Sequence, residues 1–178
     1  MSLRISPRMC FSRYTGKLIN TGKLYLFPVK HKNKLVGYQG ISLKEGDDLD
    51  QSIIDLVLNI EKYPEFVPFC LDSHVYERNK EGNQILIIAD LTIGKGPFKD
   101  TYKSDVKFDK NNSSINVINI GGPLKHLENN WYFSENESGT EISFDIDFEI
   151  ENKFLNVLMS KSFEFGLNKI ADAFQKRA

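Results

Sequence analysis

The side chains best suited to bind a metal ion or to act as a nucleophile are few in this sequence. The three histidines, His31, His74 and His126, lie far apart along the chain, and so do the two cysteines, Cys10 and Cys70. Zinc sites in proteins use closely spaced pairs, such as His-x-x-x-His or Cys-x-x-Cys, and neither pattern occurs in the sequence. We therefore predict no metal site and no disulfide framework, and expect each histidine to be a surface or strand residue.

Two further stretches combine charged groups with glycine-rich or apolar sequence. Gly94-Lys95-Gly96-Pro97 is not a phosphate-binding loop, because that loop needs Gly-x-x-x-x-Gly-Lys followed by Ser or Thr.

Asp90 is the single acid at the centre of the apolar run from Gln84 to Ile93. One side of the last predicted strand is wholly apolar and offers no catalytic group: Ile142, Phe144, Ile146 and Phe148. We therefore predict that the protein binds a ligand rather than catalyses a reaction, with no catalytic residue.

The elements that position these residues are organised around the last forty or so residues. From Thr140 to Ile150 apolar and polar residues alternate, which predicts a half-buried strand. From Leu155 to Phe174 apolar or small residues recur with helical spacing, which predicts an amphipathic helix of about six turns. So wide an apolar face needs a large surface to pack on, and the preceding sheet is the nearest one. We predict an α+β fold in which a curved antiparallel sheet wraps around a long C-terminal helix.

The remaining elements follow from the same periodicities. Apolar residues with helical spacing predict a helix from Asp48 to Glu61. Between Tyr63 and Cys70, Pro64 and Pro68 prevent a normal helix or central strand, so this segment is predicted to be a rigid turn or a single helical turn. The predicted strands cover residues 34–43, 74–78, 84–93, 98–108, 114–120, 124–133 and 140–150.

Charge is distributed unevenly along the 178 residues. The first 44 residues hold nine Lys or Arg and no acid, which leaves 14 basic against 24 acidic residues, a net charge of -10, from Glu45 onwards. Such an acidic domain repels phosphates, so we predict no nucleic-acid partner, and the row Lys99, Lys103 and Lys107 is interpreted as a solvated strand face. No stretch approaches the 18 or so apolar residues of a membrane span.

The basic N-terminal segment has the composition of a mitochondrial transit peptide. We predict that residues 1–33 form a basic presequence or disordered arm, and that residues 34–178 form the folded domain. A basic disordered arm or a membrane-surface tether are the alternatives for this segment.

Four pieces of sequence, spread over residues 34–178, carry a family resemblance. They are Val36-Gly37-Tyr38; Tyr63-Pro64-Glu65-Phe66-Val67-Pro68-Phe69-Cys70; Gly122-Pro123-Leu124-x-x-Leu127-x-x-x-Trp131-x-Phe133; and Asp147-Phe148-Glu149-Ile150 with the helix end Ala173-Phe174-x-x-Arg177-Ala178. In these pieces the chain resembles the START-like (polyketide cyclase/dehydrase) superfamily, and within it the mitochondrial coenzyme Q-binding protein family. Phe69 departs from the family pattern, which usually has Trp there.

The resemblance implies a helix-grip fold with an apolar cavity between the sheet and the C-terminal helix. It implies binding of coenzyme Q (ubiquinone) or its late precursors, and a carrier or chaperone role in respiratory electron transport and quinone biosynthesis. No cofactor is expected beyond ubiquinone as the bound ligand. The implied location is the matrix side of the mitochondrial inner membrane, with peripheral membrane contact and with respiratory or quinone-biosynthesis complexes as partners.

The resemblance also places particular side chains on the cavity, with plain core packing as the alternative for each. The predicted ligand-binding residues are Phe66, Val67 and Pro68 at the mouth, Leu91, Ile93, Phe98, Trp131, Phe133, Phe144, Ile146 and Phe148 on the sheet, and Leu158, Met159, Ser162, Phe163 and Gly166 on the helix. Ser162 and Gly166 are small, which either permits close packing of helix and sheet or leaves room for a ligand. Tyr102 or Tyr132 is a candidate hydrogen-bond donor to a quinone carbonyl.

Two other functions are compatible with the same superfamily. One is a ribosome-associated protein related to the ribosome-association toxin, a bacterial relative of the family. That function would call for a basic surface. The other is an enzyme of the cyclase or dehydratase type, which would need a polar group inside the cavity.

Overall fold

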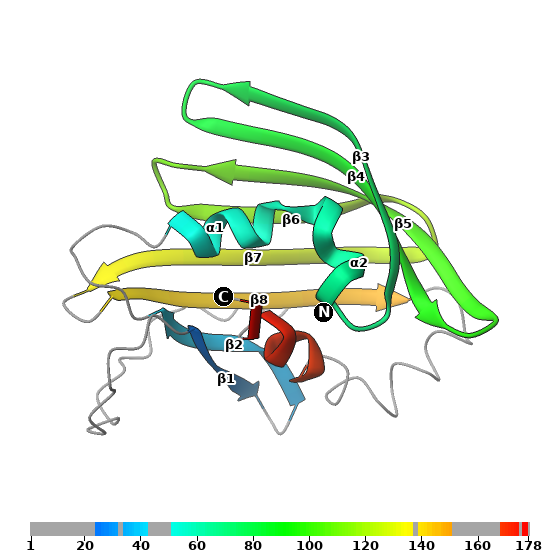
Figure 1. The fold of residues 1–178 in the computed structure, drawn as a ribbon, viewed down its shortest axis with the longest axis horizontal. Helices are drawn as coiled ribbons and strands as arrows, with labels where there is room; N and C mark the ends of the chain where they lie inside the picture. The colour runs from blue at the N-terminus through cyan, green and yellow to red at the C-terminus, as the bar shows by residue number, and fades with distance from the viewer. Residues whose placement is uncertain are drawn as a thin grey trace.

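The computed structural model describes residues 24–31, 34–42, 51–136, 139–150, 168–174 and 176–177. Within these residues the chain forms one antiparallel sheet of eight strands with helices on one side (Figure 1). The strands are β1 (Leu24–His31), β2 (Lys34–Ser42), β3 (Cys70–Glu81), β4 (Gln84–Lys95), β5 (Phe98–Asp109), β6 (Ser114–Gly121), β7 (Leu124–Asn136) and β8 (Gly139–Ile150), and the helices are α1 (Gln51–Leu58), the 3₁₀ turn η1 (Ile60–Lys62) and α2 (Tyr63–Phe66). The described residues 168–174 and 176–177 are helical and are called the C-terminal helix below.

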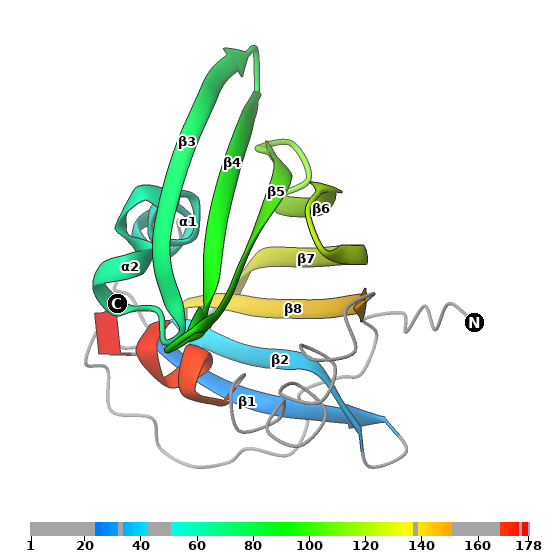
Figure 2. The ribbon, with the colours of Figure 1, turned by 90° about the vertical axis from the view of Figure 1, so that its right-hand side faces the viewer.

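The strand order is β1-β2-β8-β7-β6-β5-β4-β3, so the two ends of the sheet are formed by segments on either side of α1. Strands β3 to β8 are a meander of hairpins, and β2 joins it by pairing with β8. The sheet bends strongly, and α1, α2 and the C-terminal helix lie on the side towards which it curves (Figure 2). This arrangement confirms the predicted α+β, helix-grip fold.

The core lies between the helices and the inner face of the sheet. Helix α1 contributes Ile53, Ile54, Val57 and Leu58, whose spacing is that of an amphipathic helix. The C-terminal helix contributes Ala171 and Phe174 to the same buried cluster as the strand residues. The part of the predicted helix from residue 155 to residue 167 lies outside the described residues.

The segment between Tyr63 and Cys70 forms a single helical turn, as its two prolines predict. Helix α2 has Pro64 in its first turn, where the missing N–H is not needed, and it ends at Val67, which is extended. Phe69 then takes a positive φ of 67°, and its carbonyl accepts a 2.9 Å hydrogen bond from the backbone N–H of Gly94. The segment is thereby anchored to the end of β4 and turns the chain into β3.

The sheet begins earlier in the chain than the sequence predicts. The sequence predicts that residues 24–31 belong to an arm outside the domain, but they form β1, which pairs with β2 from Leu24 with Ser42 to His31 with Lys34. Pro28 lies in this strand, which is tolerated because β1 is at the edge of the sheet. The presequence itself stays a prediction, since residues 1–23 lie outside the described residues.

Gly122, between β6 and β7, permits a close approach of two backbones. Its φ is 103°, and an added Cβ would lie 2.6 Å from the carbonyl oxygen of Thr101 and 2.7 Å from the Cα of Tyr102. We expect Gly122→Ala to lower the free energy of unfolding by roughly 2–4 kcal/mol. The alanine would be strained at this positive φ, and backbone atoms of β5 would have to move to make room for its Cβ. Denaturant titration measures this difference.

Gly82→Ala is the matched control for that prediction. Gly82 also has a positive φ, 58°, but an added Cβ there would meet no described atom within 4 Å. We expect Gly82→Ala to lower the free energy of unfolding by only roughly 1 kcal/mol, the cost of a left-handed conformation for alanine. Equal losses in the two variants would contradict the role of close approach at Gly122.

Candidate binding site

A row of aromatic side chains crosses the inner face of the sheet. Trp131 on β7 pairs with Ile115 on β6 and with Phe144 on β8, so these three side chains share a face. The indole of Trp131 stacks on Phe144 with centroids 4.5 Å apart and an interplanar angle of 15°, and on Phe133 at 6.4 Å and 7°. All four side chains are buried. They form a flat, apolar floor in the middle of the sheet.

Phe174 joins this floor to the helices above it. Its ring centroid lies 5.8 Å from Trp131, 5.7 Å from Tyr63 and 5.3 Å from Phe66. The contacts with Tyr63 and Phe66 are edge-to-face, the arrangement that aromatic quadrupoles favour. A continuous series of ring contacts therefore runs from Tyr63 and Phe66 of α2, through Phe174 of the C-terminal helix, to Trp131 of the sheet. We call this series the aromatic path.

Tyr63 is fixed by its hydroxyl, which donates a 2.5 Å hydrogen bond to the carbonyl of Val57 in α1. Burial, reinforced by the neighbouring Tyr102 and Cys70, raises the pKa of Tyr63 far above its ordinary value. Burial also raises the pKa of the Cys70 thiol to about 11, so this cysteine is a neutral thiol rather than a nucleophile at physiological pH. These groups are therefore uncharged where they border the aromatic path.

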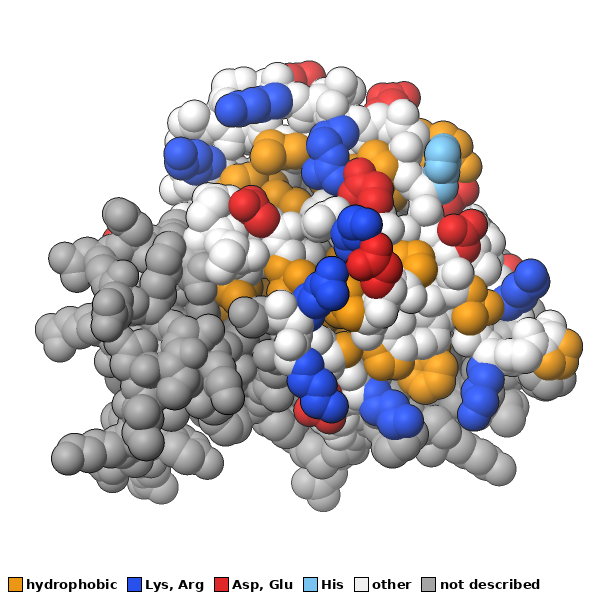
Figure 3. Space-filling model, in the orientation of Figure 1, with side chains coloured by type: hydrophobic (Ala, Val, Ile, Leu, Met, Phe, Trp, Pro, Cys, Tyr) orange, Lys and Arg blue, Asp and Glu red, His pale blue; other side chains and the backbone are white. Residues whose placement is uncertain are grey.

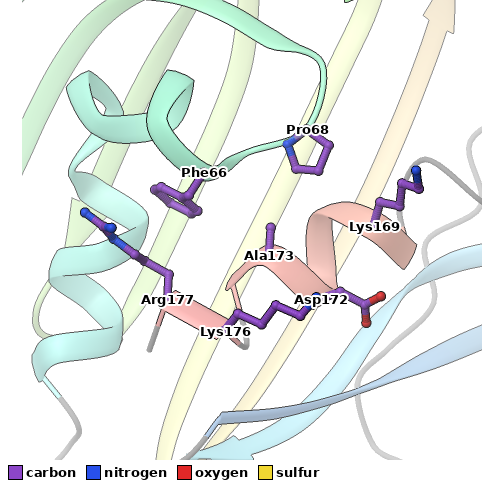
Figure 4. Close-up of a pocket in the computed structure, with 7 residues that line it drawn as sticks. All are labelled: Phe66, Pro68, Lys169, Asp172, Ala173, Lys176 and Arg177. Carbon is purple, nitrogen blue, oxygen red and sulfur yellow. The ribbon is translucent and has the colours of Figure 1, made fainter.

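A pocket opens at the outer end of the path, between α2 and the C-terminal helix. It has a volume of about 540 Å³ and is lined by Phe66, Pro68, Lys169, Asp172, Ala173, Lys176 and Arg177. Figure 4 shows Phe66 and Pro68 above the C-terminal helix, with Ala173 pointing towards the space beneath them. The guanidinium carbon of Arg177 lies 5.6 Å from the ring centroid of Phe66, and its Nη2 lies 3.2 Å from Oε2 of Glu65. These contacts connect the C-terminal helix to α2. We call this opening the mouth.

The structure brings many of the predicted site residues together. Phe66 and Pro68 line the mouth, and Val67 packs on the core beneath it. On the sheet, Leu91, Trp131, Phe133 and Phe144 are buried in the core cluster, Ile146 is packed against it, and Ile93 is half-buried. Phe98 and Phe148 lie in β5 and β8, but their side chains are not described. Leu158, Met159, Ser162, Phe163 and Gly166 lie outside the described residues.

The register separates the two tyrosines proposed as hydrogen-bond donors. Tyr102 pairs with the buried Leu91 and packs against the core, and burial raises its pKa well above the ordinary value, so it keeps its proton. Tyr132 follows Trp131 on the opposite face of β7 and is 41% exposed. Of the two candidates, only Tyr102 faces the interior.

Several residues of this region were not predicted as site residues. Phe174 continues the apolar face of the predicted helix, so its periodicity was the signal that pointed to it. Lys169, Asp172, Lys176 and Arg177 lie on the exposed side of the same helix, and they became site residues only because α2 packs across from them. No local pattern in the sequence indicates that contact.

Asp90, the one acid on the apolar strand β4, faces away from the core. It pairs with His74 and Lys103, and its carboxylate accepts a 2.7 Å hydrogen bond from the hydroxyl of Tyr76 on the outer face. His74 and His126 are exposed strand residues. Among the described residues, no group of three or more His, Cys, Asp or Glu is arranged to hold a metal ion, and no helix is long and apolar enough to cross a membrane.

A curved sheet that grips a C-terminal helix, with an aromatic interior and a mouth between α2 and that helix, defines a class of small-molecule-binding folds. Residues 51–175 match the family model described as polyketide cyclase/dehydrase and lipid transport. The chain belongs to this family, which confirms the resemblance seen in the sequence. The family's description covers both enzymes and lipid-transport proteins.

Two curated relatives are similar to the chain to the same degree. The mitochondrial coenzyme Q-binding protein COQ10 of Dictyostelium discoideum is 31% identical over 70% of this chain and 61% of its own length. The ribosome association toxin RatA of Rickettsia prowazekii is 30% identical over 72% of this chain and 87% of its own length. Among solved structures, an 18 kDa protein from Caulobacter crescentus has a TM-score of 0.60 at 24% identity, over 79% of this chain and 95% of that one, which shows the fold alone.

Proposed function

We propose that this protein binds a polyprenylated quinone, coenzyme Q or a late precursor of it, and acts as a lipid carrier that supports respiration and quinone biosynthesis. The observation that supports this function best is the aromatic path from the mouth to Trp131. Each buried methylene of a prenyl tail contributes about 0.8 kcal/mol to binding, so a tail needs an apolar path of this kind. Ubiquinone is then a bound ligand rather than a catalytic cofactor.

A carrier role fits the interior better than catalysis does. The buried core side chains of the described residues are apolar apart from Ser104 and Thr140, so no buried carboxylate or histidine is available there as a general acid or base. The one acid that the sequence offered for that task, Asp90, is hydrogen-bonded to Tyr76 on the outer face. The family's description includes enzymes, and this apolar interior supports the binding role proposed for the chain.

The mouth suits contact with a membrane surface. Three of its lining residues are basic, Lys169, Lys176 and Arg177, against one acid, Asp172. In the adjoining chain Phe69 is 37% exposed and Leu71 is 49% exposed. Figure 3 shows apolar side chains over α2 and the C-terminal helix, with both basic and acidic side chains around them. Cations that attract anionic lipid, beside apolar groups that enter the interface, are the elements of peripheral membrane binding.

We place this activity at the matrix side of the mitochondrial inner membrane. The support is the acid-free basic segment of residues 1–23, which precedes β1, and the mitochondrial location in the name of one relative. The expected partners are respiratory or quinone-biosynthesis complexes that receive the lipid. Import of a full-length fusion into isolated mitochondria tests the location.

The second candidate, association with ribosomes, is favoured by the equal similarity of the bacterial toxin. Residues 24–178, which include β1 and β2, hold 18 basic against 24 acidic residues, and this net charge of -6 opposes it, because ribosomal RNA attracts basic surfaces. Sedimentation of the full chain with ribosomes through a sucrose gradient distinguishes the two functions. Stoichiometric co-sedimentation that survives moderate salt would favour the ribosomal one.

Lipid extraction from the purified full chain, followed by mass spectrometry, tests the proposed carrier. We expect a prenylated quinone in near-stoichiometric amount. Ala173→Trp should reduce that amount several-fold, because a large ring at Ala173 would occupy the 540 Å³ mouth. Lys110→Trp places the same ring in an exposed turn and should leave the amount unchanged. Recovery of mixed phospholipid in equal amounts from all three proteins would refute the proposal.

A further inference from the structure

The inner face of the sheet is not uniformly apolar. Register places Ser73 on β3, Leu91 on β4 and Tyr102 on β5 in one row. The next row contains Ala89 and Ser104. Since Leu91 and Ala89 are core residues, the side chains of both rows point inwards. Three hydroxyl groups therefore gather at one end of the inner face.

Two of these hydroxyls are buried without a hydrogen-bond partner. Ser104 is 1% exposed, and the hydroxyl oxygens of Ser104 and Ser73 are both shielded from solvent and unbonded within the described part of the chain. Buried polar groups in folded proteins are nearly always hydrogen-bonded, and an unsatisfied one is destabilising. An unpaired pair of hydroxyls in one region is therefore a sign of a ligand that completes their bonding.

Other polar side chains near these two hydroxyls on the inner side of the sheet do have hydrogen-bond partners. Asn119, the other neighbour of Ser104 in its row, donates a 2.8 Å hydrogen bond to the carbonyl of Leu124 and accepts one from the N–H of Gly121. The hydroxyl of Tyr63 donates to Val57. The third buried side-chain oxygen without a partner, Oδ1 of Asp90, belongs to an outer-face residue, so Ser73 and Ser104 are the two on the inner face of the described strands.

The polar rows lie close to the mouth. Tyr102, in the row of Ser73, packs against the core cluster that contains Cys70, and Tyr63 and Phe66 of α2 pack against the same cluster. Pro68 lies two residues before Cys70 and lines the mouth. A ligand whose apolar tail follows the aromatic rings would therefore have its oxygen-bearing end within the same part of the molecule.

We infer that Ser73 and Ser104, beside Tyr102, are the polar anchor for the oxygen-bearing head group of the bound lipid. A serine hydroxyl both donates and accepts a hydrogen bond, so it matches the carbonyl of a quinone and the hydroxyl of a quinol alike. This assignment rests on the proposed function and adds to it that the head group, and not the tail alone, is recognised.

Two ligands with the same tail separate head-group recognition from tail binding. One is a short-chain ubiquinone and the other an isoprenoid hydrocarbon of equal tail length without oxygen. Trp131 is the sole tryptophan of the chain, so quenching of its fluorescence reports quinone binding, and displacement of the quinone reports the hydrocarbon. Full-length wild type, Ser104→Ala, Ser73→Ala and the double variant are compared.

We expect each single variant to bind the quinone about 5- to 10-fold more weakly, the loss of one neutral hydrogen bond, with the hydrocarbon unaffected. The ligand-free Ser104→Ala protein should melt at the same temperature as wild type or about 2–4 °C higher, because an unpaired buried hydroxyl is removed. Ser143→Ala on β8 is the control, since Ser143 lies between Ile142 and Phe144 and faces outwards. Ser143→Ala should change neither the affinity for the quinone nor the affinity for the hydrocarbon.

Quinone affinity that is unchanged in all three variants would overturn the anchor while leaving the carrier function standing. A parallel loss of affinity for quinone and hydrocarbon, with a lower melting temperature, would also overturn it, because the hydroxyls would then be structural. Wild-type protein that binds neither ligand would overturn the anchor and the proposed function together.

Discussion

Trp131→Ala is expected to lower the free energy of unfolding by about 3–5 kcal/mol, the range for removing a large buried ring. Trp131 is 7% exposed and contacts Phe133, Phe144 and Phe174, so its removal leaves a cavity where sheet and C-terminal helix meet. Because that helix also lines the mouth, quinone retention should fall with stability. Denaturant unfolding followed by circular dichroism measures the first effect and lipid extraction the second.

Tyr132→Ala is the matched control for this prediction. Tyr132 is the next residue along β7, also aromatic, but it lies on the outer face and is 41% exposed. Its replacement should change stability by less than about 1 kcal/mol and leave quinone retention intact. A difference between the two variants below about 1 kcal/mol would mean that Trp131 is not the centre of the core.

Reversal of charge at the mouth is expected to abolish most membrane binding. Lys169→Glu with Lys176→Glu changes the charge there by four units, and each basic residue near an anionic membrane contributes about 1 kcal/mol. The expected loss of about 4 kcal/mol corresponds to roughly a thousandfold weaker binding to vesicles that contain an anionic phospholipid. Vesicle co-sedimentation measures it, and rising salt should weaken the wild type in the same direction.

Lys107→Glu with Lys110→Glu has the same effect on net charge at the opposite end of β5, far from the mouth. This control should bind vesicles no more than a few-fold more weakly than wild type, through the change in overall charge alone. Equal losses in the two double variants would show that net charge, rather than the mouth, directs membrane contact. Arg177 is left unchanged in both because it also packs on Phe66 and Glu65.

Hydrophobic periodicity predicted most strands because, in the strands whose side chains are described, one face is turned towards the core. In β8, Ile142 and Phe144 are buried, while Ser143 between them is only half-buried, as the alternation in the sequence indicates. Pro64 and Pro68 likewise predicted the short turn that became α2, since proline limits the backbone locally. Such features depend on neighbours in the sequence.

β1 was missed because its signal was weak for a physical reason. Its sequence contains Pro28 and belongs to an acid-free basic segment, both of which argue against a central strand. The segment is an edge strand, which a proline tolerates, and its partner β2 supplies the hydrogen bonds. Pairing of this kind depends on the rest of the sheet rather than on the strand's own residues.

Strand irregularities limited the prediction of the site itself. β3 shifts register between Cys70 and Asp72 and again between Val75 and Glu77, so its inward-facing residues cannot be counted from one end. Ser73 also precedes the strand predicted over residues 74–78, so the sequence did not indicate it as an inward residue. The choice between Tyr102 and Tyr132 also depended on register, which the sequence left open.

By itself, the sequence determined the order of the elements from β2 to β8, the apolar faces, the two charge regimes and the family, because periodicity, proline positions and motifs are local properties of the chain. Only the tertiary structure decided that Phe174 connects Trp131 to Phe66, that basic residues of the C-terminal helix face α2, and that Ser73 and Ser104 share the inner face. These relations join residues that are tens of positions apart. Packing and strand register bring them together, and no short stretch of sequence specifies either one alone.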